Sequence, residues 1–389
     1  MTGNSSKMYV AKTLAGLEPL LVNELIGMGF EKVAALKRGA EFEADYEGMI
    51  KANMGSRYAI RILEPFWEDR VRDTDDLYNK IKRMPWQEVL GNDDTFAVNA
   101  TTKSDAFTHS HYTALRVKDA IVDRFRERSG SRPSIDTEAP NLRIDVMIQG
   151  DVLRVSLDSS GDSLHRRGYR PASAKAPLNE ILAAAMIEFS GWTPDQPLYI
   201  PMCGSGTLVM EAAMRAAGLP SQWYRTHYGF MHWRNFDKER MMKVRKELWD
   251  NRTPVVPRIY ASDIDRAAVK QTLESLSKVS WQHQVTVKQA DFFALEKPAE
   301  PGVIILNPPY GERMRPENIE QLYRDIGKKL KESYVGSKAW IISSNYDAYI
   351  QLGFRPSAKH TLFNGQLECR YAGFDLYEGS RKTKSITEE

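Results

Sequence analysis

Residues 198–207 read LYIPMCGSGT, an apolar run joined to two closely spaced glycines, and this stretch decides the fold of the second half of the chain. The short apolar run predicts a buried strand, and the apolar spacing over residues 207–217 predicts a helix. Glycines at such a junction allow a tight turn and a close approach of the backbone to a ligand, and the helix start offers unpaired N–H groups. The stretch therefore predicts a ligand-binding strand–turn–helix unit, although a plain glycine-rich turn explains it equally well when it stands alone.

Strands and helices alternate on both sides of this stretch. The predicted strands are 258–262, 285–289, 302–306 and 339–343, and the predicted helices are 178–189, 266–276 and 319–332. Residues 365–378 alternate like an antiparallel edge strand after a turn at Asn364 and Gly365. This order predicts an α/β fold with a mostly parallel, doubly wound, Rossmann-like sheet over residues 161–389.

Acidic residues end the next two predicted strands. Asp263, followed by Ile264, lies where an acid commonly binds ribose hydroxyls, and Asp265 is placed to cap the next helix instead. Asp291 is placed to accept a hydrogen bond from an adenine amine, with Phe292 beside the ring. A turn with an Asp and core aromatics is the alternative for this second pair. Together the two strand ends predict an edge that binds a nucleoside.

Asn307-Pro308-Pro309-Tyr310 follows the apolar strand 302–306. An amine conjugated to a purine ring is a poor nucleophile because its lone pair is delocalised. The side-chain oxygen of Asn307 and the carbonyl of Pro308 can accept its two hydrogens and aim the lone pair at a methyl group, while the prolines hold both acceptors rigidly. Tyr310 is placed to stack on a base turned out of its helix. A proline-rich loop that simply ends a strand is the alternative.

The four motifs lie at the carboxyl ends of successive strands, which is the arrangement of class I methyltransferases that use S-adenosylmethionine. We therefore predict methyl transfer to an exocyclic amine, without a metal ion. The residues expected to carry catalysis are Asn307, Pro308, Pro309 and Tyr310. The residues expected to bind the donor are Pro201, Cys203, Gly204, Ser205, Gly206, Thr207, Asp263, Ile264, Asp291, Phe292 and Asn307.

The first 160 residues follow a different pattern, in which short strands and helices mix as in α+β domains. Two units are expected, one over residues 1–60 and one over residues 61–160, with the core of the second starting as early as residue 45. Basic residues outnumber acidic ones over residues 103–132, and the connector 164–170 reads LHRRGYR. Such faces are usually only solvated, but here we expect RNA contacts. The residues expected to make them are Lys103, Arg116, Lys118, Arg166, Arg167 and Arg170.

Composition is that of a globular protein, with 42% hydrophobic and 27% charged residues and a formal net charge of +3. No apolar run is long enough to span a membrane, and the chain start lacks the apolar core of a signal peptide, so a cytoplasmic location is expected. Cys203 and Cys369 are far apart, which excludes a disulfide framework and a zinc site of the usual spacing. The HExxH, deaminase and P-loop patterns are absent from the sequence. Nothing in the sequence demands more than a monomer.

Six segments together resemble a known family. They are LHRRGYR (164–170), APLNEILAAAMI (176–187), PMCGSGTLVMEAA (201–213), ASDID (261–265), NPPYGER (307–313) and NGQLECR (364–370). They occur in the order seen in bacterial THUMP-containing 23S rRNA guanine-N2-methyltransferases of the RlmL type. RVKDAIVDRF (116–125) resembles the helix of their THUMP domain. The resemblance covers about residues 5–375.

The resemblance implies an N-terminal ferredoxin-like subdomain, a THUMP RNA-binding domain and a Rossmann-like catalytic domain. It also implies S-adenosylmethionine as donor, guanine N2 as acceptor, and 23S rRNA or a ribosomal precursor as partner. One departure is Ile200, where the family usually has an acid that contacts the donor; we expect that contact to be missing or supplied elsewhere, for example by Glu211. Some family members carry a second methyltransferase domain, and from the chain length we expect a monofunctional protein here.

Residues 219–255 form a surplus between two predicted strands, rich in aromatic and basic side chains. We expect a helical insertion on the active-site side, either a packed lid or a surface for single-stranded RNA. Other substrates stay open. A guanine N2 in tRNA is one alternative, and Asn-Pro-Pro-Tyr also serves adenine-N6 methyltransferases of DNA or RNA and enzymes that methylate a glutamine amide in proteins. A non-catalytic RNA-binding protein with a degenerate methyltransferase fold is a further alternative, which Ile200 favours and the intact motif residues oppose.

Overall fold

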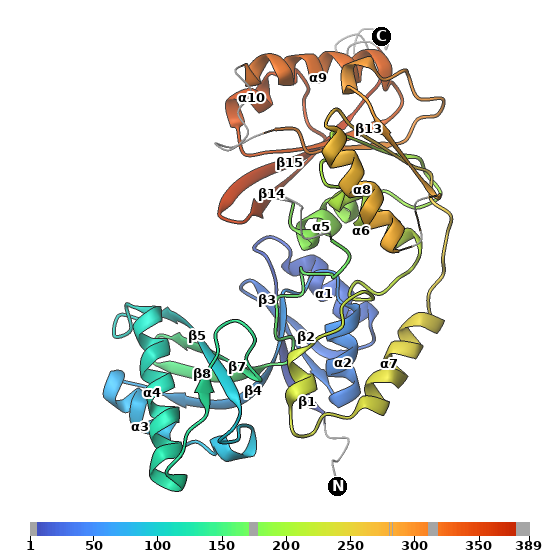
Figure 1. The fold of residues 1–389 in the computed structure, drawn as a ribbon. Coiled ribbons are helices and arrows are strands. Elements are labelled where there is room, and N and C mark those ends of the chain that lie inside the picture. The colour runs from blue at the N-terminus through green and yellow to red at the C-terminus, as the bar shows by residue number, and fades with distance from the viewer. Residues whose placement is uncertain (1–5, 171–177, 280, 282, 310–317, 379–389) are drawn as a thin grey trace. The chain divides into compact units, whose positions relative to one another are not determined.

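The computed structural model describes residues 6–170, 178–279, 281, 283–309 and 318–378 (Figure 1). The chain divides into two compact units. The first unit takes Met1–Thr13, Glu18–Arg166 and Gln222–Asp250, and the second takes Leu14–Leu17, Arg167–Ser221 and Asn251–Glu389. In the described ranges no helix is both long and apolar enough to cross a membrane.

The first unit is built on one eight-stranded sheet with the order β2-β3-β1-β4-β8-β7-β5-β6. Its strands are β1 (Lys7–Lys12), β2 (Glu31–Leu36), β3 (Gly39–Ala44), β4 (Arg61–Arg70), β5 (Thr95–Lys103), β6 (Ser134–Ile135), β7 (Leu142–Gln149) and β8 (Val152–Asp158). Its helices are α1 (Glu18–Gly27), α2 (Tyr46–Gly55), α3 (Thr74–Arg83), α4 (Ser110–Ser129) and α7 (Lys238–Asp250), with 3₁₀ turns η1 (Trp86–Glu88) and η2 (Gly229–His232).

Strand β4 joins the two halves of this sheet. Its start pairs with β1, where Leu63 lies opposite Val10, and its remainder pairs with β8, where Arg70 lies opposite Val152. The predicted boundary between residues 60 and 61 therefore falls at the start of a strand that both α+β halves share. Helices α3 and α4 lie side by side (Figure 1). They bury Leu77, Ile81 and Val117 in the core that they share with β5, β7 and β8.

The second unit contains a seven-stranded sheet with the order β11-β10-β9-β12-β13-β15-β14. Its strands are β9 (Leu198–Pro201), β10 (Ile259–Asp263), β11 (Val285–Gln289), β12 (Val303–Leu306), β13 (Lys338–Ser343), β14 (Ala358–Asn364) and β15 (Leu367–Asp375). Its helices are α5 (Glu180–Ser190), α6 (Thr207–Ala216), α8 (Arg266–Lys278), α9 (Ile319–Ser333) and α10 (Tyr346–Ile350), with the 3₁₀ turn η3 (Phe292–Ala294).

The strand order of the second unit confirms the predicted Rossmann-like fold. Strand β9 lies in the middle, the sheet grows to β10 and β11 on one side and to β12 and β13 on the other, and these five strands run parallel. Strand β15 is inserted antiparallel between β13 and β14. Because the carboxyl ends of parallel strands share one edge, the ends of β9, β10, β11 and β12 lie along that edge together.

The insertion of residues 219–255 differs from our prediction. Its central part, Gln222–Asp250, belongs to the first unit and not to the Rossmann-like unit. Helix α7 lies beside α2 (Figure 1), with an ion pair of 2.8 Å between Lys243 and Glu47. Many of its aromatic rings are used in packing, as in the stack of Trp223 on Trp249 at 4.5 Å between ring centroids. Burial of its apolar groups against the first unit explains why the segment packs there.

Candidate functional site

The loop after β9 has the close-packed form that its glycines predict. Gly204 and Gly206 both have positive φ angles, +55° and +82°, which glycine adopts without strain. A Cβ on Gly206 would lie 2.6 Å from Oγ1 of Thr272, whereas a Cβ on Gly204 would meet no described atom within 4 Å. Gly206 is therefore required for packing against α8, and Gly204 leaves open space where a ligand can approach the backbone.

Asp263 shapes this loop from the end of β10. One carboxylate oxygen accepts a hydrogen bond from the Gly204 N–H at 2.8 Å, and the other accepts from the Asp265 N–H at 2.9 Å. Thr272 also donates to the Gly204 carbonyl at 3.1 Å. Asp265 accepts from the Ala267 N–H at 2.8 Å and so caps α8, the alternative that its position suggested. Asp263 is thus in direct contact with the predicted donor loop.

Cys203 lies inside the same loop but is not a nucleophile. Its side chain is buried, and burial together with the nearby charge of Asp263 raises the pKa of the thiol to about 12. A thiol with such a pKa carries almost no thiolate at neutral pH.

The third strand end differs from the prediction in one residue. Asp291 caps η3 by accepting from the Phe293 N–H at 3.0 Å. The ring of Phe292 is only 2% exposed and packs in the core, where it faces Tyr334 at 6.1 Å between ring centroids. Our expectation that this ring flanks an adenine is wrong, because the core already covers it. Phe293, which the sequence reasoning passed over, is 37% exposed instead.

Asn307 provides a buried polar atom at the end of β12. The strand is buried along its whole length, and the side-chain oxygen Oδ1 of Asn307 is also buried. Among the described residues this oxygen has no hydrogen-bond partner. An unpaired buried acceptor costs about 1–3 kcal/mol, so a donor from a bound molecule would relieve that cost. Pro308 is buried beside it, and Tyr310 lies outside the described residues.

The end of the LHRRGYR segment, from Arg167 onward, lies inside the second unit and supports it. The Arg167 side chain is fully buried and lies 3.4 Å from Glu211 of α6, and the Tyr169 hydroxyl donates to the same carboxylate at 3.0 Å. Our expectation that Arg167 contacts RNA is therefore wrong, because its guanidinium has no exposed surface. Glu211, expected as a substitute contact for the donor at Ile200, is itself buried in this cluster; Ile200 is a core residue of β9.

Arg170 is held in a similar way. It pairs with Glu180 at 3.1 Å and donates to Oγ1 of Thr207 at 3.0 Å, so it ties α5 to the start of α6 next to the glycine loop. Burial raises the pKa of Glu180 to about 7, although Arg170 acts in the opposite direction. The Arg170 side chain is 22% exposed, so most of its surface packs within the fold and is not available to a nucleic acid.

The four remaining basic residues of the RNA prediction lie on the first unit. Lys103 is exposed at the end of β5. Arg116 pairs with Asp75 at 3.1 Å, Lys118 with Asp119 at 2.9 Å, and Arg166 with Asp162 at 3.4 Å. Exposed ion pairs of this kind are weak and exchange readily for a phosphate. These side chains therefore remain candidates for RNA contact, but the structure does not gather the predicted six into one patch.

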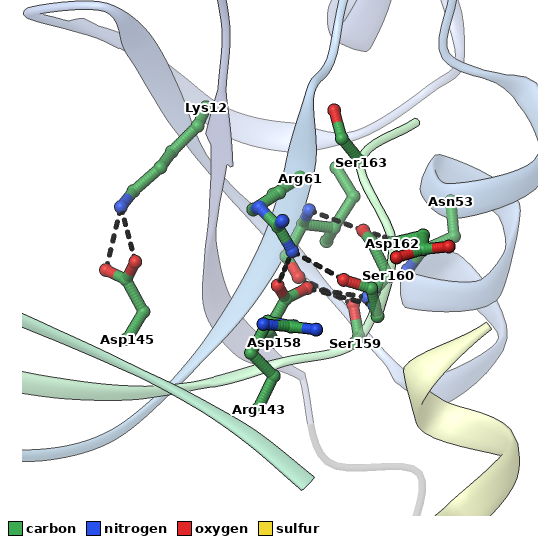
Figure 2. Close-up of polar contacts among 12 residues, drawn as sticks. Lys12, Asn53, Arg61, Arg143, Asp145, Asp158, Ser159, Ser160, Asp162 and Ser163 are labelled. Atoms are coloured by element: carbon green, nitrogen blue, oxygen red, sulfur yellow. Dashed lines mark hydrogen bonds and ion pairs between the residues drawn. The ribbon is translucent and has the colours of Figure 1, made fainter. Parts of the chain in front are cut away.

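A group of cations that the sequence did not reveal lies on the sheet of the first unit (Figure 2). Lys12 pairs with Asp145 at 2.7 Å, and Arg61 pairs with the buried carboxylate of Asp158. Burial lowers the pKa of Arg143, as does the nearby charge of Arg61. The five residues come from four strands, so only the pairing of those strands brings them together. The only signal in the sequence was a charged residue within each strand.

The comparisons with known proteins follow the same division of the chain. The RMKL-like methyltransferase domain matches residues 167–373. The chain belongs to this methyltransferase family. The THUMP domain matches residues 71–158, and the RlmL ferredoxin-like domain matches residues 8–63. These matches confirm the predicted family and the predicted fold classes of both halves.

Two relatives match nearly the whole chain. A Methylococcus capsulatus protein named ribosomal RNA large subunit methyltransferase K/L is 35% identical over 98% of this chain and 55% of its own length. A Synechocystis sp. protein named as an RNA methyltransferase, slr0064, is 35% identical over 96% of this chain and 98% of its own length. The chain thus spans about half of the K/L relative and nearly all of the Synechocystis protein.

Two solved structures are similar over nearly the whole chain. The crystal structure of SMU.472 complexed with S-adenosylhomocysteine has a TM-score of 0.85 at 26% identity, covering 97% of this chain and 100% of that chain. A structure named as an N6-adenine-specific DNA methylase from Listeria monocytogenes has a TM-score of 0.84 at 27% identity, covering 96% of this chain and 97% of that chain.

A cavity of about 450 Å³ in the second unit lies away from most of the motif residues. Its lining includes the stacked rings of Tyr199 and Tyr260, on β9 and β10, together with Lys288 and Glu300. Of the predicted donor-binding residues only Pro201 borders it. No group of His, Cys, Asp and Glu suited to a metal ion occurs within the described residues.

Proposed function

We propose that this protein transfers a methyl group from S-adenosylmethionine to the exocyclic N2 amine of a guanine in RNA, with 23S rRNA or a ribosomal precursor as substrate. The observation that carries the proposal is the buried, unpaired Oδ1 of Asn307 at the strand edge that also holds the glycine loop. The names of the K/L relative and of the Synechocystis protein support RNA as substrate. The family resemblance of the sequence motifs supports guanine N2 as acceptor.

The residues present fit S-adenosylmethionine. The open space beside Gly204 and the exposed turn at Ile264 would admit its amino-acid and nucleoside parts, as the complex of SMU.472 with S-adenosylhomocysteine suggests for a similar fold. Asp263, already bonded to the loop, would bind the ribose, and Asp291 the adenine. When bound, the donor supplies an electrophilic methyl group on a positively charged sulfur.

The chain then supplies acceptors and a rigid frame. Oδ1 of Asn307 accepts one hydrogen of the target amine, and the carbonyl of Pro308 accepts the other. Both contacts weaken conjugation of the nitrogen lone pair with the ring, so the nitrogen can bond to the methyl carbon as the carbon–sulfur bond breaks. The extra proton on nitrogen leaves afterwards. In this scheme, Asn307 gains a hydrogen bond that no described residue gives it.

The test is transfer of labelled methyl from S-adenosylmethionine to unmodified 23S rRNA, with nucleoside analysis of the product. N2-methylguanosine is the expected product. Transfer to tRNA alone would support the same reaction with tRNA, instead of rRNA, as the substrate. Absence of both donor binding and transfer to any RNA would reject the proposal and favour a non-catalytic RNA-binding protein. The loss of donor binding would then be explained by Ile200, which stands where the family usually has an acid that contacts the donor.

A second candidate is methylation of adenine N6 in a nucleic acid. It is favoured by one observation, the name of the similar Listeria monocytogenes structure. The amine chemistry at Asn307 is the same for both bases. The THUMP match makes RNA the better substrate than DNA. Nucleoside analysis separates the candidates, because the adenine reaction would release N6-methyladenosine.

A further inference from the structure

An exposed aromatic and basic pair lies on the same sheet edge as Asn307 and has no role in the reaction above. Tyr346 begins α10 and is separated from the end of β13 by Ser344 and Asn345. Its side chain is 57% exposed. Arg370 belongs to β15, where it lies opposite Ser343, the last residue of β13. The guanidinium carbon of Arg370 lies 4.4 Å from the ring centroid of Tyr346.

The position of the pair relative to Asn307 follows from the strand register. Leu306, the last residue of β12, lies opposite Ile341 of β13, and Ser343 of β13 lies opposite Arg370. Two strand spacings of about 4.8 Å therefore separate the backbone of Asn307 from that of Arg370, roughly 10 Å in all. A nucleotide next to the one held at Asn307 would reach that distance.

Within the described residues, the charge of Arg370 meets only the rings of Tyr346 and Tyr349. No acidic side chain among the described residues forms an ion pair with it, and no described acceptor takes a hydrogen bond from its guanidinium. Glu368 lies two residues earlier on the same strand face, outside ion-pairing range. Most other arginines of this unit, such as Arg167 and Arg170, have carboxylate partners. A stacked, half-buried guanidinium without an acid partner is suited to a phosphate.

The aromatic side of the pair is also more exposed than packing requires. Tyr349, one turn further along α10, lies 5.7 Å from Arg370 but is buried and faces Phe374 in the core. Tyr346 makes no comparable core contact, and the neighbouring Ile350 and Leu367 are 54% and 48% exposed. An exposed ring beside an arginine is the combination that binds single-stranded nucleic acid by stacking.

We propose that Tyr346 and Arg370 form a binding site for the nucleotide next to the target base, in which the Tyr346 ring stacks on its base and the Arg370 guanidinium binds its phosphate. The inference rests on the proposed function for the identity of the nucleic acid as RNA. It adds a substrate contact on β15 and α10 to the donor and amine contacts on β9, β10, β11 and β12. The site holds the strand on one side of the target and so positions the flipped base.

The test compares Tyr346→Ala and Arg370→Gln with matched controls at the opposite edge of the sheet. The controls are Tyr377→Ala, 51% exposed after the end of β15, and Arg355→Gln, exposed before β14. Steady-state methylation of a 23S rRNA fragment and RNA binding by fluorescence anisotropy at several salt concentrations are both measured, and donor affinity serves as the folding check.

We expect Tyr346→Ala to raise the KM for RNA about 10-fold, as loss of one base stack would, with donor affinity unchanged. Arg370→Gln should weaken RNA binding about 10-fold. It should also reduce the slope of log affinity against log salt by about 1, the value for one lost phosphate contact. A purely structural role of Arg370 would leave this slope unchanged. Tyr346→Phe should bind RNA like the wild type, and Arg370→Lys should fall between wild type and Arg370→Gln.

Equal RNA affinity and equal salt slope for Arg370→Gln and Arg355→Gln would overturn the inference, whatever the enzyme methylates. If the wild-type protein transfers no methyl group but Arg370→Gln still lowers the salt slope of RNA binding, the proposed reaction fails and the RNA contact stands. If the wild type methylates RNA and none of the variants changes KM or the slope, the reaction stands and this site does not exist.

Discussion

The loops after β9 and β12 lie on the same sheet edge but differ in how their polar groups are satisfied. After β9, the Gly204 N–H and carbonyl already bond to Asp263 and Thr272. After β12, the oxygen of Asn307 has no partner among the described residues. The backbone groups of Gly204 are thus paired without a ligand, whereas in the proposed reaction Asn307 gains a hydrogen bond from the substrate. The proposal therefore assigns donor affinity to the first loop and chemistry to the second.

The largest effect is expected at Asn307. Asn307→Ala should lower kcat for methyl transfer about 100- to 1000-fold, the usual cost of losing one contact that acts in the transition state, and leave donor affinity nearly unchanged. Single-turnover transfer and calorimetric donor titration measure the two quantities. Asn318→Ala is the matched control, because Asn318 only caps α9 by accepting from the Gln321 N–H at 3.1 Å. Retained turnover in Asn307→Ala would reject the role of its amide oxygen.

The next effect concerns the carboxylate under the glycine loop. Asp263→Ala removes two charge-assisted hydrogen bonds and the proposed ribose contact, so we expect donor affinity to fall about 10- to 100-fold. Asp265→Ala should cost only the cap of α8, about 1 kcal/mol of stability, and keep donor affinity. Calorimetry on both variants measures the contrast, and equal donor affinities would contradict the assignment.

A pair of glycine variants separates packing from ligand space. Both Gly206→Ala and Gly204→Ala are strained by positive φ, but only the first places a methyl group 2.6 Å from Thr272. We expect Gly206→Ala to be less stable than Gly204→Ala by about 1–3 kcal/mol, the usual cost of overpacking. Thermal unfolding of the two variants, and of Gly206→Ala combined with Thr272→Ala, measures this. No recovery in the double variant would show that Thr272 is not the obstacle.

The smallest effect is the pH dependence at Glu180. Burial raises its pKa from the ordinary 4.5 to about 7, so the protonated form favours the fold and stability should fall as pH rises between these values, by at most about 3 kcal/mol. Glu180→Gln imitates the protonated form and should lose that part of the dependence. Melting temperatures from pH 5 to pH 8 measure it, with the exposed Glu320→Gln as control. Parallel curves for wild type and Glu180→Gln would contradict the raised pKa.

The strands of the second unit, their order along the chain and the positions of the motifs at their ends were predictable from the sequence. Apolar periodicity located the strands at 258–262, 285–289 and 339–343, which agree with β10, β11 and β13 to within one residue at each end. The strand-end positions of Asp263, Asp291 and Asn307 followed from the same pattern. The roles of these residues in the reaction remain predictions.

Basic side chains were harder to assign, because charge in a sequence does not indicate exposure. Arg166 and Arg167 are neighbours, yet the first has a side chain that is 68% exposed and the second is fully buried against Glu211. The carboxylate that makes the difference lies on α6, far along the chain. The same reason explains why the cations around Arg61 and Arg143 were missed.

Periodicity, glycines and prolines act over a few residues, so the sequence by itself determined the elements, their order and the local chemistry of each strand end. Three features depended on the tertiary structure: the continuous sheet through β4, the packing of α7 on α2, and the pairing of Tyr346 with Arg370. Each joins segments distant in sequence, and each is selected by burial of apolar surface or by strand register. A truncation of residues 1–160 would therefore also expose the face of α7 that α2 covers.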